Sequence, residues 1–163
     1  MRPLRREDAQ AVTRAMQDRN VVRMLTAPPH PYLPEHAEEF LARAKDAPFA
    51  WAITLDGLLG AVDIADHLGY WLAPPAWGQG IMTRAARAAV DHYFSTTQAE
   101  TLVSGHLFDN PASGRVLANL GFEVSGQSQV HVKSRGGLVQ HVDMSLARAA
   151  WETGATALDH GDL

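Results

Sequence analysis

The feature that most constrains this chain is a strand–turn–helix unit in its middle. Residues 68–73 (LGYWLA) form an apolar run typical of a strand, and two prolines end it. A turn containing Gly78 and Gly80 follows, and the alanine-rich residues 81–95 predict a long helix. The first N–H groups of a helix lack intrahelical acceptors, and the helix dipole adds positive potential there. The unit therefore indicates either a phosphate-binding turn or an ordinary strand-to-helix connection.

The remaining sequence predicts one α+β domain around a mixed sheet. We expect strands at residues 1–5, 49–55, 58–65, 68–73 and 101–108, a strand that starts at 122–124, and a final hairpin over 129–146. Helices are expected at 9–19, from 34, at 81–95 and at 110–120. The strands over 49–73 should form an antiparallel meander, and the strand at 101–108 should lie parallel to 68–73 after a right-handed crossover. Residues 1–152 form the domain, and the small, polar residues 153–163 predict a frayed tail.

Composition excludes several classes of function. The chain has no cysteine, which removes disulfides, thiolate metal sites and a cysteine nucleophile. A net charge of −4, a pI of about 6.0 and scattered basic residues argue against a nucleic-acid partner and against a membrane surface. The sequence has no signal-peptide pattern and no apolar run long enough to span a bilayer, so a cytoplasmic protein is expected.

Four blocks along the chain resemble a known family. They are Arg2-Pro3-Leu4 with PPHPY (28–32) and EFL (39–41), then LGYWL (68–72) with WGQGIMT (77–83), then NPAS (110–113) with LGF (120–122), and finally AWE (150–152). Together they resemble the GNAT superfamily of N-acetyltransferases, in its RimJ/RimL branch that acetylates the N-termini of ribosomal proteins. The resemblance implies a GNAT-like fold, with a central, mostly antiparallel sheet, a splayed parallel pair of strands and flanking helices.

The same resemblance implies the reaction and the residues that bind its donor. It implies acetyl-CoA as co-substrate, without a metal, and direct acetyl transfer to a primary amine, either a protein N-terminal α-amine or a small-molecule amine. In the superfamily pattern Gln/Arg-x-x-Gly-x-Gly/Ala, Trp77 stands at the first position, Gly80 at the glycine and Met82 at the last. The implied acetyl-CoA-binding residues are Tyr70, Trp71, Leu72, Trp77, Gly78, Gln79, Gly80, Ile81, Met82, Thr83, Asn110 and Ser113.

Two residues are the candidate catalytic groups. The resemblance makes Ser113 the proton donor to the leaving thiolate, although Ser113 also completes the first turn of a helix that Asn110 caps. His67 stands where many relatives carry Glu, and a histidine titrates in the range that general-base catalysis needs. The alternatives are a solvated His67 in a turn, with Asp63, Asp66 or a water molecule as the base.

Other histidines and one loop have interpretations of their own. His131 and His141 would face each other across a final hairpin with a three-residue turn, which predicts a surface pair rather than a metal site, since a third ligand is lacking. His106 is expected to line the acceptor side of the strand at 101–108. The proline-rich loop that ends at Tyr32 is either an acceptor-binding loop or a plain connector.

Three questions stay open at this level. A degenerate module that holds acetyl-CoA without transferring the acetyl group is the alternative to an enzyme, and it rests on the missing Glu at His67. A homodimer through an exposed strand edge or the final hairpin is a further hypothesis. The identity of the amine is undetermined, and either the first strand is short or the true start lies upstream of Met1.

Overall fold

The strands of this chain form two sheets. The computed structural model describes residues 1–159. Across these residues, one sheet has the strand order β1-β2-β3-β4 and the other β5-β7-β6. The elements are β1 (Arg2–Pro3), α1 (Ala9–Gln17), α2 (Arg19–Val22), α3 (Pro34–Ala44), β2 (Ala50–Leu55), β3 (Gly57–Ile64), β4 (Leu68–Leu72), α4 (Ile81–Thr96), β5 (Thr101–Leu107), α5 (Pro111–Asn119), β6 (Glu123–Val132), β7 (Gly137–Ala147) and α6 (Arg148–Asp159), with short 3₁₀ turns at Arg6–Asp8, Pro74–Ala76 and Lys133–Arg135.

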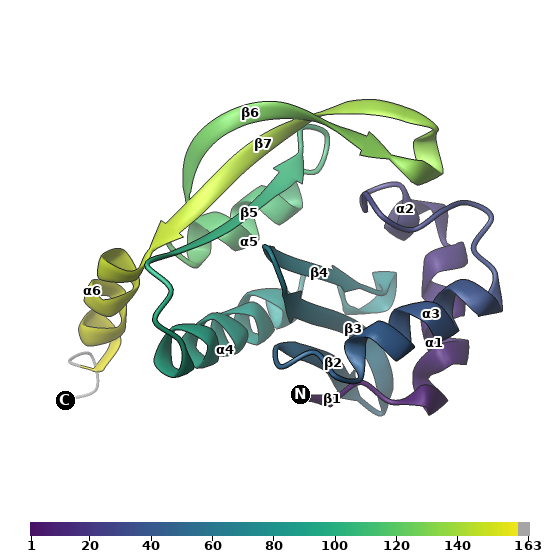
Figure 1. Cartoon of the computed structure of the whole chain (residues 1–163), viewed down its shortest axis with the longest axis horizontal. Coiled ribbons are helices and arrows are strands. Elements are labelled where there is room, and N and C mark those ends of the chain that lie inside the picture. The colour runs from purple at the N-terminus through teal and green to yellow at the C-terminus, as the bar shows by residue number, and fades with distance from the viewer. Residues whose placement is uncertain (160–163) are drawn as a thin grey trace.

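The first sheet separates two hydrophobic cores. Because side chains alternate between the faces of a strand, Val62 and Ile64 of β3 pack with Phe94 of α4 in one core, whereas Ala61 packs in the other core with α1 and α3. Figure 1 shows α1 and α3 on one side of this sheet and α4 on the other. The antiparallel meander β2–β3–β4 is confirmed, and the Asp56-Gly57 turn joins its first two strands.

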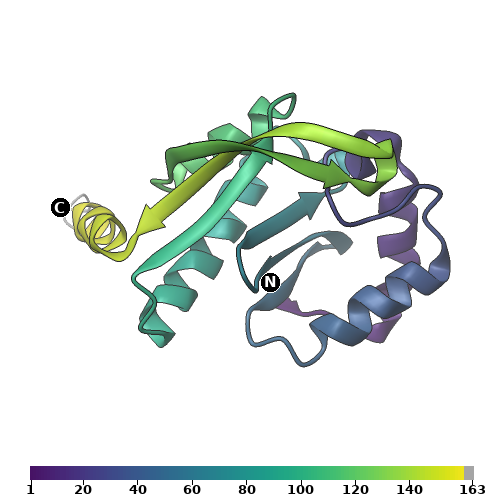
Figure 2. The ribbon, with the colours of Figure 1, turned by 45° about the horizontal axis from the view of Figure 1, so that its top comes forward.

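Strands β4 and β5 lie side by side in the same direction and then diverge (Figures 1 and 2). No ladder joins them in the described part of the chain; the sheets end at β4 and at β5. A hydrogen bond from Ser104 Oγ on β5 to the carbonyl of Leu68 on β4 (2.8 Å) links them. The predicted parallel pair is thus splayed, and the space between its strands belongs to the site rather than to a continuous sheet.

The final hairpin is longer than the sequence predicts. Residues 122–124 and the strand expected from 129 are one continuous strand, β6, which pairs with β7 from Glu123 to Val132. The register shifts between Val124 and Gly126, so a bulge absorbs an extra residue and interrupts the alternation that marks a strand. The strand start expected at residues 122–124 is confirmed at Glu123, whereas its continuation into the final hairpin was not predicted.

The C-terminal segment forms a helix that extends into the region expected to fray. Helix α6 extends to Asp159, so helical backbone covers residues 153–159 of the segment expected to fray; residues 160–163 lie outside the described residues. Arg148 starts this helix and donates to the carbonyls of Phe94, Thr97 and Ala99, at 2.8–2.9 Å. These bonds satisfy carbonyls at and beyond the end of α4 and fasten α6 there.

The predicted helix at residues 9–19 is two helices. Asp18 has extended backbone angles (φ −72°, ψ 117°) and separates α1 from α2. Its carboxylate accepts a hydrogen bond from the N–H of Asn20 (2.8 Å), so Asp18 serves as the N-cap of α2. The break turns α2 toward the β6–β7 hairpin, which brings the segment after it to the site.

Asp8 ties the first strand to the start of α1. Its buried carboxylate accepts hydrogen bonds from the Arg2 guanidinium (2.6 and 2.8 Å) and from the N–H of Arg5 (2.8 Å). The hydrogen bond from Arg2 lowers the pKa of Asp8, against the opposing effect of burial.

We expect Asp8 to stabilise the fold at neutral pH and to lose this effect in acid. Its pKa is lower in the folded chain than the value of about 4 of an unfolded one, so the contribution is complete above that value and disappears as pH falls through the folded-state pKa. Denaturant titrations from neutral pH to about pH 2 should show a steeper loss of unfolding free energy in wild type than in Asp8→Asn. Identical pH dependence in the two proteins would contradict this role.

Candidate functional site

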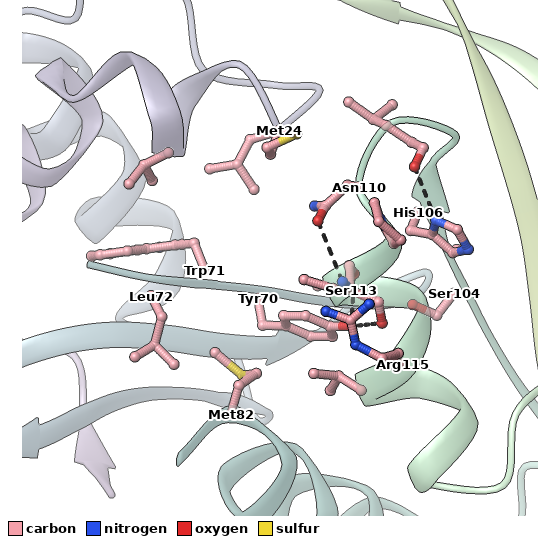
Figure 3. A pocket seen from close by; sticks show the side chains of 18 of the residues that line it. Met24, Tyr70, Trp71, Leu72, Met82, Ser104, His106, Asn110, Ser113 and Arg115 are labelled. Carbon is pink, nitrogen blue, oxygen red and sulfur yellow. Dashed lines mark hydrogen bonds between the residues drawn. The ribbon is translucent and has the colours of Figure 1, made fainter. Parts of the chain in front are cut away.

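A cleft of ≈ 1020 Å³ opens where β4 and β5 diverge. Its walls come from β4, the start of α4, the end of β5 and the first turns of α5, and residues 20–26 close one side (Figure 3). Val130 of β6 and His141 of β7 complete the lining. The cleft is at the upper end of the size range of small-molecule sites.

The turn before α4 presents backbone N–H groups to this cleft. Gly78 and Gly80 have φ values of 70° and 68°, in the left-handed region, and Gly80 directly precedes the helix. Within the described residues, the N–H groups of residues 78–83 have no acceptor. A Cβ on either glycine would meet no atom within 4 Å, so the turn faces open space. Unpaired donors at the start of a long helix favour the binding of an anion such as phosphate.

Two side chains of this turn hold its conformation. Trp77 Nε1 donates to the carbonyl of Leu72 at the end of β4 (2.7 Å), and Gln79 Nε2 donates to the carbonyl of Pro75 (2.8 Å). Trp77 therefore fastens the turn to β4, and Gln79 fastens it to the 3₁₀ turn at Pro74–Ala76. That the turn binds an anion through its backbone stays a prediction.

Strand β4 exposes part of its backbone toward β5. Backbone groups of a strand in an antiparallel pair alternate between its two edges. The N–H of Ala73 bonds toward β3, so residues 68, 70 and 72 turn their N–H and C=O groups to the opposite edge, which is the edge of the sheet.

Two of the carbonyls on this edge already have partners. The carbonyl of Leu68 accepts from Ser104 Oγ, and the carbonyl of Leu72 accepts from Trp77 Nε1. The N–H and C=O of Tyr70 and the N–H of Leu72 stay available in the cleft, which is lined by both residues. This edge is able to pair with an extended ligand that carries amides, in the manner of an added strand.

Asn110 and Ser113 lie together at the start of α5, as predicted. Asn110 Oδ1 accepts from the N–H of Ser113 (3.3 Å), so Asn110 is the N-cap of this helix. The half-buried Ser113 lines the cleft and directs its hydroxyl to β4. Figure 3 shows both side chains on the same wall of the cleft.

Sequence analysis missed the hydroxyl of Tyr70. It lies 2.9 Å from Ser113 Oγ and donates to the Ser113 carbonyl (3.1 Å), so the two hydroxyls form one hydrogen-bonded pair. Burial raises the pKa of Tyr70 to about 12, with the bond to Ser113 acting in the opposite direction. The phenol therefore keeps its proton at neutral pH. In the sequence, this hydroxyl is indicated only by the presence of a tyrosine within an apolar strand. Core packing explains that pattern equally well.

The predicted base His67 lies exposed in the β3–β4 turn. Its Nε2 and Oδ1 of Asp63 both approach Gly69, at 3.8 and 3.4 Å from the position of an added Cβ. Burial raises the pKa of Asp63, and the charge of His67 partly offsets this rise. His67 lines the cleft, whereas Asp66 is exposed in the same turn and is not part of the lining.

The predicted pair of His131 and His141 is wrong. His131 lies opposite Leu138, and His141 lies opposite Ser128, because the turn spans residues 133–136 and pairs Val132 with Gly137. His141 lines the cleft with His106, whose ring packs against Gly114 of α5. His106 thus faces α5 at the edge of the cleft.

Salt bridges close one side of the cleft. The carboxylate of Asp109, after β5, pairs with Arg23 (3.1 Å) and with Arg135 (2.9 Å) from the β6–β7 turn. The N–H of Lys133 donates to the carbonyl of Thr26 (3.1 Å), and Ser134 Oγ donates to the carbonyl of Val22 (3.1 Å). The segment after α2 is therefore fastened to the tip of the hairpin.

The loop at residues 28–32 does not line the cleft. Tyr32 is only 5 % exposed and packs in the core between the first sheet and α1 and α3, with its ring 5.3 Å from the ring of His36. The acceptor-binding interpretation of Tyr32 was wrong, because this tyrosine fills a hydrophobic core. The lining of the cleft includes residues from 20–26 and none from this loop.

Two further features bear on the kind of site. Among residues 1–159, no group of three or more His, Asp or Glu side chains is placed to hold a metal ion. No helix in this part of the chain has the length and apolar character needed to cross a membrane.

Comparison with known sequences identifies relatives of this chain. The family model described as an acetyltransferase (GNAT) domain matches residues 1–123. A ribosomal-protein alanine N-acetyltransferase of Escherichia coli is 30% identical over 90 residues, which cover 55% of this chain and 46% of that protein. The chain thus matches slightly less than half of the length of that relative.

Solved structures share the fold. A ribosomal-protein alanine acetyltransferase from Vibrio fischeri aligns with a TM-score of 0.77 at 20% identity, over 92% of this chain and 93% of that one. A spermidine N-acetyltransferase from Vibrio cholerae, in complex with CoA and spermine, aligns with a TM-score of 0.75 at 17% identity, over 93% and 96%. Because the family model matches well over half of the sequence, this chain belongs to the GNAT acetyltransferase domain family.

Proposed function

We propose that this chain transfers an acetyl group from acetyl-CoA directly to a primary amine. The observation that carries the proposal is the set of unpaired N–H groups at residues 78–83, which faces the cleft that also holds the Tyr70–Ser113 hydroxyl pair. One end of the cleft is suited to a pyrophosphate, and the hydroxyls are suited to protonate a leaving thiolate.

The residues divide this work between them. The backbone of residues 79–83 binds the phosphates, and the free edge of β4 at Tyr70 and Leu72 pairs with the amides of the pantetheine arm. A backbone N–H on that edge also polarises the thioester carbonyl. Ser113, hydrogen-bonded to Tyr70, gives its proton to the departing sulfur. His67 is the base that the sequence offers, but it lies exposed in a turn.

For the acceptor, we propose an α-amine at a protein N-terminus or a small amine. Relatives named above act on ribosomal-protein alanine, and a structural neighbour is a spermidine acetyltransferase. Action on a ribosomal protein would place this chain in the cytoplasm.

Calorimetric titration with acetyl-CoA is expected to give micromolar binding at one site per chain. Release of free thiol should then be followed with a peptide that begins with alanine and with spermidine as acceptors. No acetyl-CoA binding would overturn the proposal. Binding without thiol release for either acceptor, or for a wider amine panel, would favour the alternative of a module that holds acetyl-CoA without transferring its acetyl group.

A further inference from the structure

A second histidine in the cleft has an orienting carboxylate, which His67 lacks. His141 Nδ1 lies 2.7 Å from Oδ1 of Asp143, and the same oxygen accepts from Ser128 Oγ (2.8 Å) on β6. The hydrogen bonds from His141 and Ser128 lower the pKa of Asp143, so its carboxylate is ionised at neutral pH and accepts the Nδ1 proton. In the neutral imidazole this leaves Nε2 with a free lone pair.

The backbone around this ring is shaped to admit it. A Cβ on Gly105 would lie 2.2 Å from His141 Cε1 and 2.8 Å from Nε2, so only a glycine at this position of β5 lets the ring lie against the strand. Gly105 thus accommodates the His141 ring between β5 and β7.

The ring also lies where a base is needed. His141 and Gly105 line the same cleft as Ser113 and the free edge of β4. The His141 side chain is 18 % exposed, so it is largely screened from water yet reachable from the cleft. Within residues 1–159, Nε2 has no hydrogen-bond partner.

The other titratable groups near the cleft are less suited to the role. His67 lies across the cleft in a turn, and in the described part of the chain no hydrogen bond orients its ring. His106 faces α5 from β5, and its Nδ1 is 2.9 Å from the carbonyl of Leu107. Asp109 is held by Arg23 and Arg135, which lower its pKa.

We propose that His141 is the general base for the amine acceptor and that Asp143 is its positioning residue, an inference that rests on the proposed function. Nε2 takes one proton from the substrate ammonium group. The freed lone pair of the amine nitrogen forms the C–N bond to the acetyl carbon as the C–S bond breaks, and the sulfur takes the proton of the Ser113 hydroxyl. The acylated nitrogen then loses its second proton through water to the Ser113 alkoxide, which restores that hydroxyl. His141 releases its proton to solvent, so the cycle balances without an oxidant or a metal.

The test compares kcat/KM against pH for wild type, His141→Gln, Asp143→Asn, His67→Gln and the control His131→Gln. The substrates are acetyl-CoA and a peptide that begins with alanine, or spermidine if the peptide is inactive. His141→Gln should lose about 10²-fold near neutral pH and recover as the pH rises past the value of about 8 at which an α-amine loses its own proton. Asp143→Asn should show a loss of about 10-fold with the same recovery.

The controls separate this inference from the proposed function. His131→Gln, at an exposed position on β6, should keep the wild-type profile, and all variants should keep wild-type acetyl-CoA affinity by calorimetry. His67→Gln tests the competing candidate base. An equal loss at every pH, or a pH-dependent loss in His67→Gln instead, would overturn the role of His141. Wild type without activity on any amine would instead refute the proposed function, and this inference with it.

Discussion

Ser113→Ala should lower kcat by about 10²-fold or more while leaving the affinity for acetyl-CoA within a few-fold. The variant removes the hydroxyl placed 2.9 Å from Tyr70 and keeps the N–H that Asn110 caps, so the start of α5 stays intact. Departure of the sulfur as an unprotonated thiolate then limits the rate. Steady-state thiol release measures kcat, and calorimetry measures affinity.

The hydroxyl pair supplies a companion variant. Tyr70→Phe keeps the ring and removes the hydroxyl that is hydrogen-bonded to Ser113, so it should also lower kcat, but by less than Ser113→Ala does. Because the pKa of Tyr70 is about 12, the decrease in kcat of this variant should be independent of pH across the neutral range. Ser95→Ala, at the exposed end of α4, is the matched control. Wild-type kcat in Ser113→Ala would assign the proton to another donor.

Gly80→Pro should raise the Kd for acetyl-CoA by about 10²-fold or more. Proline fixes φ near −65°, whereas Gly80 has a φ of 68°, and proline has no N–H to offer an anion. The turn before α4 must therefore change shape and lose a donor. Calorimetric titration of the folded variant measures the effect.

A second glycine controls for backbone strain. Gly136, in the β6–β7 turn, has a φ of 69° and does not line the cleft. Gly136→Pro should therefore lower stability with less loss of binding. A folded Gly80→Pro protein that binds acetyl-CoA as wild type does would show that the turn is only structural.

Local patterns predicted the parts of the fold that local chemistry decides. The strand–turn–helix unit and the Asp56-Gly57 hairpin are found as expected, because proline, glycine and helix-start preferences act within a few residues. The continuity of β6 from its predicted start into the hairpin was missed, because the bulge within it depends on pairing with β7. Tyr32 was misplaced, since no local pattern tells a loop tyrosine in a core from one on a surface.

The candidate site likewise contains features that the sequence predicts and features that it does not. Its backbone elements, the turn at residues 78–83 and the edge of β4, followed from motif and sheet position. The Tyr70–Ser113 pair joins residues 43 positions apart, so spacing does not predict it. His141 and Asp143 are two positions apart and share a face of β7, but the spacing does not tell that this face meets the cleft. The roles of Ser113, His67 and Asn110 toward a substrate stay predictions.

The gap between β4 and β5 also links the stability of this chain to its ligand. The folded chain leaves backbone groups of Tyr70 and Leu72 unpaired near its centre, and an unfolded chain has no such edge to offer. A ligand that binds only the folded form adds RT ln(1 + [L]/Kd) to its stability, about 2.7 kcal/mol at a concentration 100 times Kd. The resistance of the chain to heat and proteolysis would then increase with the cellular concentration of the acetyl donor, which would pair with the free edge of β4 as a neighbouring strand does.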